Sequence, residues 1–389
     1  MSLSRDDRSR IADWWWTVDR VALGALFSLG AIGLMLAFAA SPAATAHNSL
    51  QAGNFHFALK QILFAVIAGL IVAAGSLLSL RNLKIAAACL FVAALVGSVL
   101  VLLTGAEVLG ARRWVDLGFL TIQPSEFLKP SFAVLCAAVL SNTQKGGLAK
   151  EVVSFLLVLI PLALLILEPD VGQTGLLLAI WGAMLFLAGV SLVWVGATTG
   201  VGTALAALAY VLIPHVHHRV EQFLGGGKPG YQSGLALKAF EHGGLTGVGP
   251  GAGTIKYHIP YAHSDFIFAV AGEEFGLVLC GIIAALFCLL SVRLLLRAAA
   301  ARDRFSQLAG SGLALIVALQ AFINMGVALS LLPAKGMTLP FISYGGSSLF
   351  AVAVTMGFAL AVTRERPGTM AALSQRETDL FFGLGEARA

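Results

Sequence analysis

Asp265 is the residue best suited to acid–base chemistry. It lies in a glycine-rich segment that runs into an apolar helix, GPGAGTIKYHIPYAHSDFIFAVAGEEFG, from Gly249 to Gly276. The pattern predicts that Ser264 caps this helix and that Asp265 occupies its first turn, where the positive end of the helix dipole stabilises a carboxylate. Such an anion beside water can act as a general base, an effect typically worth about 10²–10⁴ in rate. The alternative is an aspartate that only starts a helix.

The residues around Asp265 argue against two kinds of site, a hydrolytic triad and a dinucleotide-binding loop. His263, Ser264 and Asp265 are consecutive, so their side chains point in different directions and do not form a hydrolytic triad. The glycine spacing in the same segment lacks the strand–helix context of a dinucleotide-binding fingerprint. Lys256 and His263 remain as candidates for contacts with an anionic ligand.

A second candidate segment is LPAKGMTLPFISYGGSS, from Leu332 to Ser348, which precedes the last apolar run. Its prolines and glycines predict non-helical backbone, followed by a helix N-terminus whose free amides can hold a phosphate. The alternative is a purely structural turn. The candidate ligand contacts of this segment are Lys335, Ser343, Gly345, Gly346 and Ser347.

A third candidate segment is GARRWVDLGFLTIQPSEFLKP, from Gly110 to Pro130. Its paired arginines carry planar donor forks that suit phosphate, and Glu126 and Lys129 are three residues apart on one helix face. The alternative is ion pairing among these groups. The candidate ligand contacts are Arg112, Arg113, Trp114, Gln123, Glu126 and Lys129.

The composition indicates that membrane helices position these segments. The chain is 58% hydrophobic and 12% charged over 389 residues, whereas soluble domains have about 25% charged residues. A membrane-spanning helix needs about 20 mostly apolar residues. Ten spans are predicted, near 21–40, 61–80, 85–104, 127–140, 151–167, 174–213 (two spans), 275–292, 305–331 and 347–363. The fold class is therefore an all-α integral membrane protein of about ten transmembrane helices.

The distribution of Lys and Arg predicts the orientation. Ten spans place both termini on one side, and that side holds 16 of the 25 basic residues, which makes it cytoplasmic. The predicted organisation is a cytoplasmic tail (1–20), a membrane domain (21–363) with a large periplasmic loop between helices 7 and 8 (214–264), and a second cytoplasmic tail (364–389). The net charge of +5 then needs no nucleic-acid partner, because these residues face anionic lipid.

Other polar residues have simpler explanations. The four cysteines fall inside predicted spans without metal-type spacing, which indicates buried packing. The cluster His215, His217 and His218 indicates an amphipathic helix end, with a metal site as the alternative. Gln320 and Asn324 share one helix face, which predicts hydrogen bonds between helices. Acidic groups at the outer helix mouths are functional candidates, namely Glu168, Asp170, Glu273 and Glu274.

Three stretches, AHSDFIFAVAGEEFG, PFISYGGSS and RRWVDLGFLTIQPSEFLK, resemble motifs of the SEDS family of cell-shape, elongation and division proteins. LPAKGMTLPFISYGGSS and WWWTVDR look most like its cell-division branch. The resemblance runs from Trp14 to about Arg366, with the motifs in the family's order.

The resemblance implies a peptidoglycan glycosyltransferase that polymerises lipid II, the undecaprenyl-pyrophosphate-linked precursor. Asp265 matches the family's essential aspartate, which implies that it deprotonates the acceptor GlcNAc 4-hydroxyl for attack on the donor MurNAc anomeric carbon. Undecaprenyl pyrophosphate then departs, and its charge needs a cation. The candidates are a divalent ion (Mg²⁺ or Mn²⁺), Arg112, Arg113, Lys129, Lys256 and Lys335.

The implied partners are a class B penicillin-binding transpeptidase and other division-complex membrane proteins. The implied location is the bacterial inner membrane at the division septum, with the active site on the periplasmic side. Two alternatives stay open, a lipid II flippase and a scaffold that recruits the transpeptidase. Of the three functions, only the enzyme requires Asp265 as a base.

Overall fold

The computed structural model describes residues 10–47, 55–105, 107–108, 111–116, 118, 120–142, 149–212, 217, 221, 231–333 and 336–364. The predicted all-α fold is confirmed, since helices make up nearly all of the regular structure in these ranges. The longer helices are α1 (Arg10–Thr17), α2 (Arg20–His47), α3 (His56–Ser76), α4 (Leu80–Thr104), α5 (Pro124–Leu140), α6 (Lys150–Leu167), α7 (Val171–Leu187), α8 (Leu192–Leu212), α10 (Tyr231–Gly243), α11 (Ile267–Ala299), α12 (Arg304–Ala328) and α13 (Gly346–Thr363).

Short elements lie in the connections between these helices. A 3₁₀ turn covers Ile255–His258. Between α4 and α5, β1 (Glu107–Val108) pairs antiparallel with β2 (Ala111–Arg112), and β3 (Val115–Asp116) pairs antiparallel with β4 (Thr121–Ile122).

Within the described residues, seven helices are long and apolar enough to cross a membrane: α2, α3, α4, α6, α11, α12 and α13. The shorter apolar helix α7 and the helices α5 and α8 lie where three further spans are predicted. The chain is thus a multi-pass membrane protein, while the count of ten spans stays a prediction.

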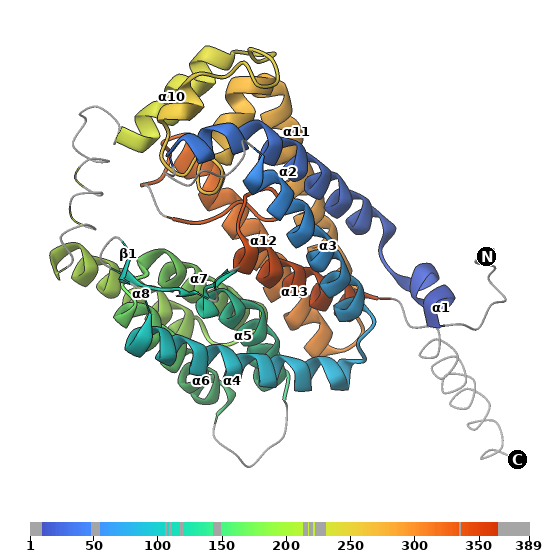
Figure 1. The fold of residues 1–389 in the computed structure, drawn as a ribbon. Helices are drawn as coiled ribbons and strands as arrows, with labels where there is room; N and C mark the ends of the chain where they lie inside the picture. The colour runs from blue at the N-terminus through green and yellow to red at the C-terminus, as the bar shows by residue number, and fades with distance from the viewer. Residues whose placement is uncertain are drawn as a thin grey trace, which may run out of the picture.

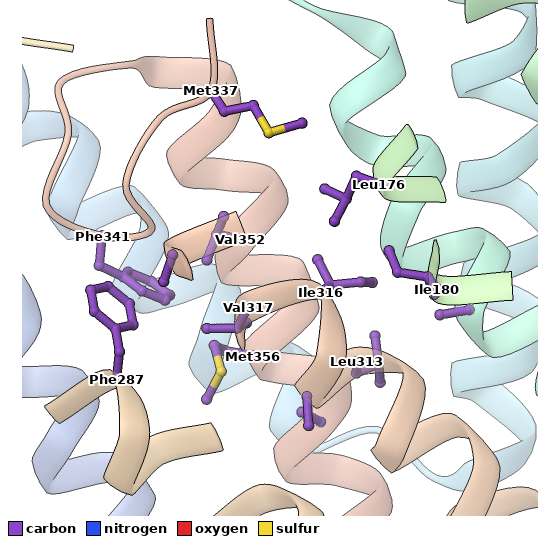
Figure 2. Close-up of a cluster of buried hydrophobic side chains, with 14 of the residues drawn as sticks. Leu176, Ile180, Phe287, Leu313, Ile316, Val317, Met337, Phe341, Val352 and Met356 are labelled. Atoms are coloured by element: carbon purple, nitrogen blue, oxygen red, sulfur yellow. The ribbon is translucent and has the colours of Figure 1, made fainter. Parts of the chain in front are cut away.

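Helices α12 and α13 run through the middle of the bundle (Figure 1). Helices α4 to α8 lie on one side of them, and α2, α3 and α11 lie on the other. Figure 2 shows Leu313 and Ile316 of α12 facing Leu176 and Ile180 of α7, with Val352 of α13 on the other side. Most of α12 and α13 is buried by the surrounding helices, whereas α2, α3, α4 and α11 bury only about a third of their most apolar stretch.

One end of the bundle is held together by polar contacts between distant segments. Asp19 is buried just before α2, and its Oδ2 accepts hydrogen bonds from Arg293 Nε and Arg297 Nε of α11, each at 2.7 Å. Trp14 Nε1 of α1 donates to Ser76 Oγ at the end of α3 over 2.8 Å. These contacts gather segments that the basic-residue count assigns to the cytoplasmic side.

The first predicted span ends too early. The structure continues α2 to His47, through Pro42, whereas the sequence predicts a span that ends near residue 40. Four alanines around the proline explain the difference, since alanine is the strongest helix former. They are Ala39, Ala40, Ala43 and Ala44.

The predicted span at 275–292 begins too late, because α11 starts at Ile267 and is broken at Gly276 (φ 75°, ψ −177°). The loop after α10 enters the break: Leu277 N donates to Gly244 O over 3.0 Å, and Val248 N donates to Glu273 O over 3.0 Å. A Cβ on Gly276 would lie 2.2 Å from Leu245 O. Glycine is therefore required by both the backbone angle and the close approach of the loop.

Candidate functional site

Asp265 lies in a tight turn just before α11. Tyr261 adopts a left-handed conformation (φ 58°), and its carbonyl accepts hydrogen bonds from Ser264 N at 3.0 Å and Asp265 N at 3.1 Å. The helix begins at Ile267, and its N-cap, Phe266, makes no side-chain cap bond. The prediction that Ser264 caps the helix with Asp265 in its first turn is therefore wrong, because Tyr261 O takes these N–H groups and delays the start of the helix. The half-buried Asp265 still lies next to the N-terminal end of α11.

The segment before α13 closes over this turn. Ser343 Oγ donates to Ser264 O over 2.6 Å, and Tyr344 N donates to His263 O over 2.9 Å. A Cβ built on Gly336 would lie 3.4 Å from Asp265 Oδ2. Two of the three segments singled out in the sequence are thus bonded to each other, with the Asp265 carboxylate lying against Gly336.

An aromatic cluster adjoins the same turn. The half-buried His263 ring lies between Phe57 of α3 and Tyr344, with ring centroids 5.0 Å and 5.6 Å away. The Phe57 and Tyr344 rings meet edge to face at 5.1 Å. Burial raises the pKa of the Tyr344 hydroxyl, so it stays neutral.

The third segment supplies a buried ion pair, which is the alternative to ligand binding that the sequence left open. Lys129 Nζ lies 2.6 Å from Glu126 Oε2, and both residues are almost fully buried. The pair has further partners, since Lys129 Nζ donates to Gln320 Oε1 over 3.1 Å and Gln173 Nε2 donates to Glu126 Oε1 over 2.5 Å. Buried charges need such compensation, and here it joins α5, α7 and α12.

Arg113 binds the connection between α6 and α7. Its Nε donates to Glu168 O over 3.1 Å, its Nη2 donates to Pro169 O, and its Nη1 lies 3.8 Å from Asp170 Oδ2. Asp170 Oδ2 also accepts a hydrogen bond from Gln123 Nε2 over 3.3 Å. The Arg113 guanidinium is therefore occupied by protein groups.

Lys256 is fully buried. Its Nζ donates to Ala39 O of α2 over 2.8 Å and pairs with Glu274 Oε1. Glu274 Oε2 accepts from Gly251 N over 2.9 Å. Lys256 therefore joins the glycine-rich loop to α2 and α11, with no surface left for a ligand in this conformation.

Glu273, the neighbour of Glu274, binds the backbone of the same loop. Its Oε1 accepts from Thr254 N and Ile255 N, each at 2.7 Å, and its Oε2 accepts from Lys256 N at 2.9 Å. His242 Nδ1 of α10 lies 3.1 Å from the same Oε1. The two glutamates thus fold the loop onto the break in α11.

The remaining candidates surround this centre. Arg112 is exposed on β2, and Trp114 is half-buried. Gly346 and Ser347 form the first turn of α13, and a Cβ on Gly346 would lie 2.3 Å from Leu120 Cδ1. Lys335, with His215 and His218, lies outside the described residues. In the described ranges no group of three or more His, Cys, Asp or Glu side chains is arranged to hold a metal ion.

Two lone amides that the sequence analysis does not single out complete the site. Gln61 Nε2 of α3 donates to Ser343 O over 3.2 Å, and Gln173 of α7 bonds Glu126. Both are buried in otherwise apolar helices. Their polarity within a membrane segment is the signal that could have found them.

Comparison with known proteins places the chain in a family. The family model of FtsW, RodA and SpoVE, described as "Cell cycle protein", matches residues 20–367. The chain belongs to this family. The resemblance to SEDS proteins is thus confirmed over nearly the whole sequence, and with it a location in the inner membrane.

Two relatives of known name align with nearly the whole chain. The chain is 41% identical to the "Probable peptidoglycan glycosyltransferase FtsW" of Caulobacter vibrioides over 390 residues, covering 100% of this chain and 98% of the relative. It is 36% identical to the protein of the same name from Coxiella burnetii, covering 90% and 97%.

Solved structures show the same fold. The rod shape determining protein RodA of Thermus thermophilus matches with a TM-score of 0.67 and 28% identity, covering 90% of this chain and 97% of RodA. A chain from a peptidoglycan synthase complex, described as coordinating polymerization and crosslinking, matches with a TM-score of 0.71 and 29% identity, covering 89% and 97%.

Proposed function

We propose that this protein is a peptidoglycan glycosyltransferase that polymerises lipid II, with Asp265 as its general base. The observation that supports this most is that the segments before α11 and before α13 meet at one half-buried carboxylate. The third segment packs on the start of α13 through Leu120 and bonds Gln320 of α12 through Lys129. The names of the two full-length relatives support the same activity.

The reaction requires one proton transfer and one substitution. Asp265 removes the proton from the 4-hydroxyl of the acceptor GlcNAc as its oxygen forms a bond to the anomeric carbon of the donor MurNAc. The bond from that carbon to undecaprenyl pyrophosphate breaks, and the leaving group departs with the electron pair. Asp265 then returns its proton to water.

The negative charge of the leaving group needs fixed donors or cations. Lys129, Lys256 and Arg113 are occupied by protein partners, so they are weaker candidates than the sequence implies. The first turn of α13 offers backbone N–H groups at a helix N-terminus, two residues after Tyr344, whose N donates to His263 O. The other candidates are Arg112, Lys335, which lies outside the described residues, and a divalent cation, Mg²⁺ or Mn²⁺.

The decisive experiment is polymerisation of lipid II by the purified protein with its class B penicillin-binding transpeptidase. Asp265→Ala and Asp265→Asn should abolish glycan formation while the protein still inserts and binds its partner. Asp13→Asn removes the same charge from an exposed position on α1 and should leave the rate unchanged. Glycan synthesis by Asp265→Ala at the wild-type rate would refute the assignment.

The same proposal includes orientation and partners. The termini are cytoplasmic and Asp265 faces the periplasm, with the chain divided into tails (1–20 and 364–389) and one membrane domain (21–363). The partner is a class B penicillin-binding transpeptidase at the division septum, in line with the similarity to a chain of a peptidoglycan synthase complex.

Labelling with a membrane-impermeant maleimide tests the orientation. In a cysteine-free variant in intact spheroplasts, a cysteine introduced at exposed Thr246 should react, and one introduced at exposed Arg302 should react only after lysis. The opposite labelling pattern would show that the termini are periplasmic and that the proposed orientation is wrong.

A further inference from the structure

Two amide side chains on α12 hold the backbone around Asp265. Gln320 and Asn324 are one helical turn apart, and each is 1% exposed. The sequence predicts hydrogen bonds between helices for this pair. Gln320 does bond α5, through Lys129, but both amides also donate to carbonyls of the outer segments.

Asn324 joins the two segments that form the site. Its Nδ2 donates to Asp265 O over 2.9 Å and to Met337 O over 2.6 Å. Because two carbonyl oxygens can be bonded only by the NH₂ end of the amide, the orientation of the side chain is fixed. One side chain therefore sets the distance between the Asp265 backbone and the segment that lies against its carboxylate.

Gln320 extends this support to the buried ion pair. Its Oε1 accepts from Lys129 Nζ over 3.1 Å, which turns its Nε2 toward Thr338 O, 3.2 Å away. Glu126 holds Lys129 in place at 2.6 Å. A continuous series of polar contacts thus runs from Glu126 on α5 to Thr338, two residues from Gly336.

The segment that these amides bond is irregular. Residues 336–339 are neither helix nor strand, so the carbonyls of Met337 and Thr338 lack the partners that regular structure supplies, while Leu339 O accepts from Ser343 N over 3.0 Å. Leaving a buried carbonyl unbonded costs about 1–3 kcal/mol. The amides of α12 therefore hold Met337 and Thr338 in place, and with them the adjoining Gly336 that lies against the Asp265 carboxylate.

We propose that Asn324 and Gln320 are positioning residues that hold the Asp265 carboxylate against the Gly336–Thr338 segment in its reactive position. This inference rests on the proposed function, since it assigns a role only if Asp265 acts as a base. Their contribution is geometric, because a misplacement of about 1 Å in a reacting group can reduce a rate by about 10²-fold.

The test compares two amides of the same helix. Gln307 lies at the other end of α12, and its Nε2 donates to Ala301 O over 2.9 Å, so Gln307→Leu removes the same kind of bond far from Asp265. Asn324→Leu should lower kcat for lipid II polymerisation about 10- to 100-fold, with the KM for lipid II changed less than about threefold. Gln307→Leu should keep both constants near wild type. Equal kcat values in the two variants would overturn the inference.

A second variant distinguishes the hydrogen bond that Gln320 donates to Thr338 O from the one that it accepts from Lys129. Gln320→Glu keeps an acceptor for Lys129 but loses the donor to Thr338 O, and it should lower kcat in the same way as Asn324→Leu. Wild-type kcat in Gln320→Glu would show that the contact with Lys129, and not the support of the segment, is what matters.

Asp265→Ala is measured in parallel. If Asp265→Ala retains full activity, the proposed function itself fails. If Asp265→Ala is inactive while Asn324→Leu matches Gln307→Leu, only the positioning role fails.

Discussion

Replacing Lys256 by Met should destabilise the protein through the carboxylate it leaves behind. Lys256 Nζ is the charged partner of Glu274, and both side chains are almost fully buried. In Lys256→Met, the hydrogen bond that Glu274 keeps among the described residues is the one from Gly251 N at 2.9 Å, and Ala39 O loses the Lys256 donor. An unpaired charge would then remain beside the break in α11.

The size of the effect follows from these contacts. Removing one partner of a buried ion pair costs about 3–5 kcal/mol. With an unfolding entropy of about 2.1 cal/mol/K per residue over 389 residues, that loss corresponds to a fall in Tm of roughly 4–6 °C. Lys256→Met/Glu274→Gln removes the unpaired charge and keeps an acceptor for Gly251 N, so it should recover more than half of the loss.

The Tm of wild type, Lys256→Met and Lys256→Met/Glu274→Gln is measured by heating each protein in detergent and quantifying the remaining folded protein by size-exclusion chromatography. Lys238→Met is the control, because Lys238 is exposed on α10, and its Tm should stay within about 1 °C of wild type. An unchanged Tm in Lys256→Met would refute the structural role of the pair. A double variant that regains stability but makes no glycan would show that the charged pair is needed for activity as well as for stability.

Three further predictions concern stability. Burial raises the pKa of Glu168, in the connection between α6 and α7, from 4.5 to about 7. Between these pH values Glu168 is ionised only in the unfolded chain, so the folded state loses stability as the pH rises. Glu168→Gln should therefore have a higher Tm than wild type at pH 8 and an equal Tm at pH 4. Gly276→Ala should lower the Tm by several degrees, because its Cβ meets Leu245 O, whereas Gly281→Ala, with open space on the same helix, should be neutral or slightly stabilising. Burial alone would raise the pKa of Asp19, but the hydrogen bonds from Ala22 N and two arginines lower it. Asp19→Asn should therefore lower the Tm at pH 7. The difference in Tm from wild type should shrink as the pH falls through the lowered pKa of Asp19.

The sequence predicts those parts of the protein that depend on local composition. Apolar runs of about 20 residues locate the spans. The three-residue spacing of Glu126 and Lys129 places them on one helix face, and the structure contains the ion pair that was the alternative to ligand binding. The family motifs lead to Asp265. Each of these inferences needs only residues that are close together in the chain.

The features that were missed depend on contacts between distant segments. The sequence analysis makes Lys256 a candidate contact for an anionic ligand, because its partners Glu274 and Ala39 O are 18 and 217 residues away. The break at Gly276 is hidden, because a lone glycine is tolerated in an apolar helix and the loop that fills the gap comes from before Asp265. Asn324 reads as a contact between helices, since nothing local shows that a loop carbonyl lies within its reach.

The fold of the glycine-rich loop also sets an order for biogenesis. The backbone donors of the loop, Gly251 to Lys256, precede in the chain the carboxylates that bind them, Glu273 and Glu274. At about 5–20 residues per second, the loop is synthesised roughly one to four seconds before its acceptors. The loop therefore lacks its final hydrogen-bond acceptors until α11 has been synthesised. The surroundings of Asp265 can take their final form only after that helix has been inserted.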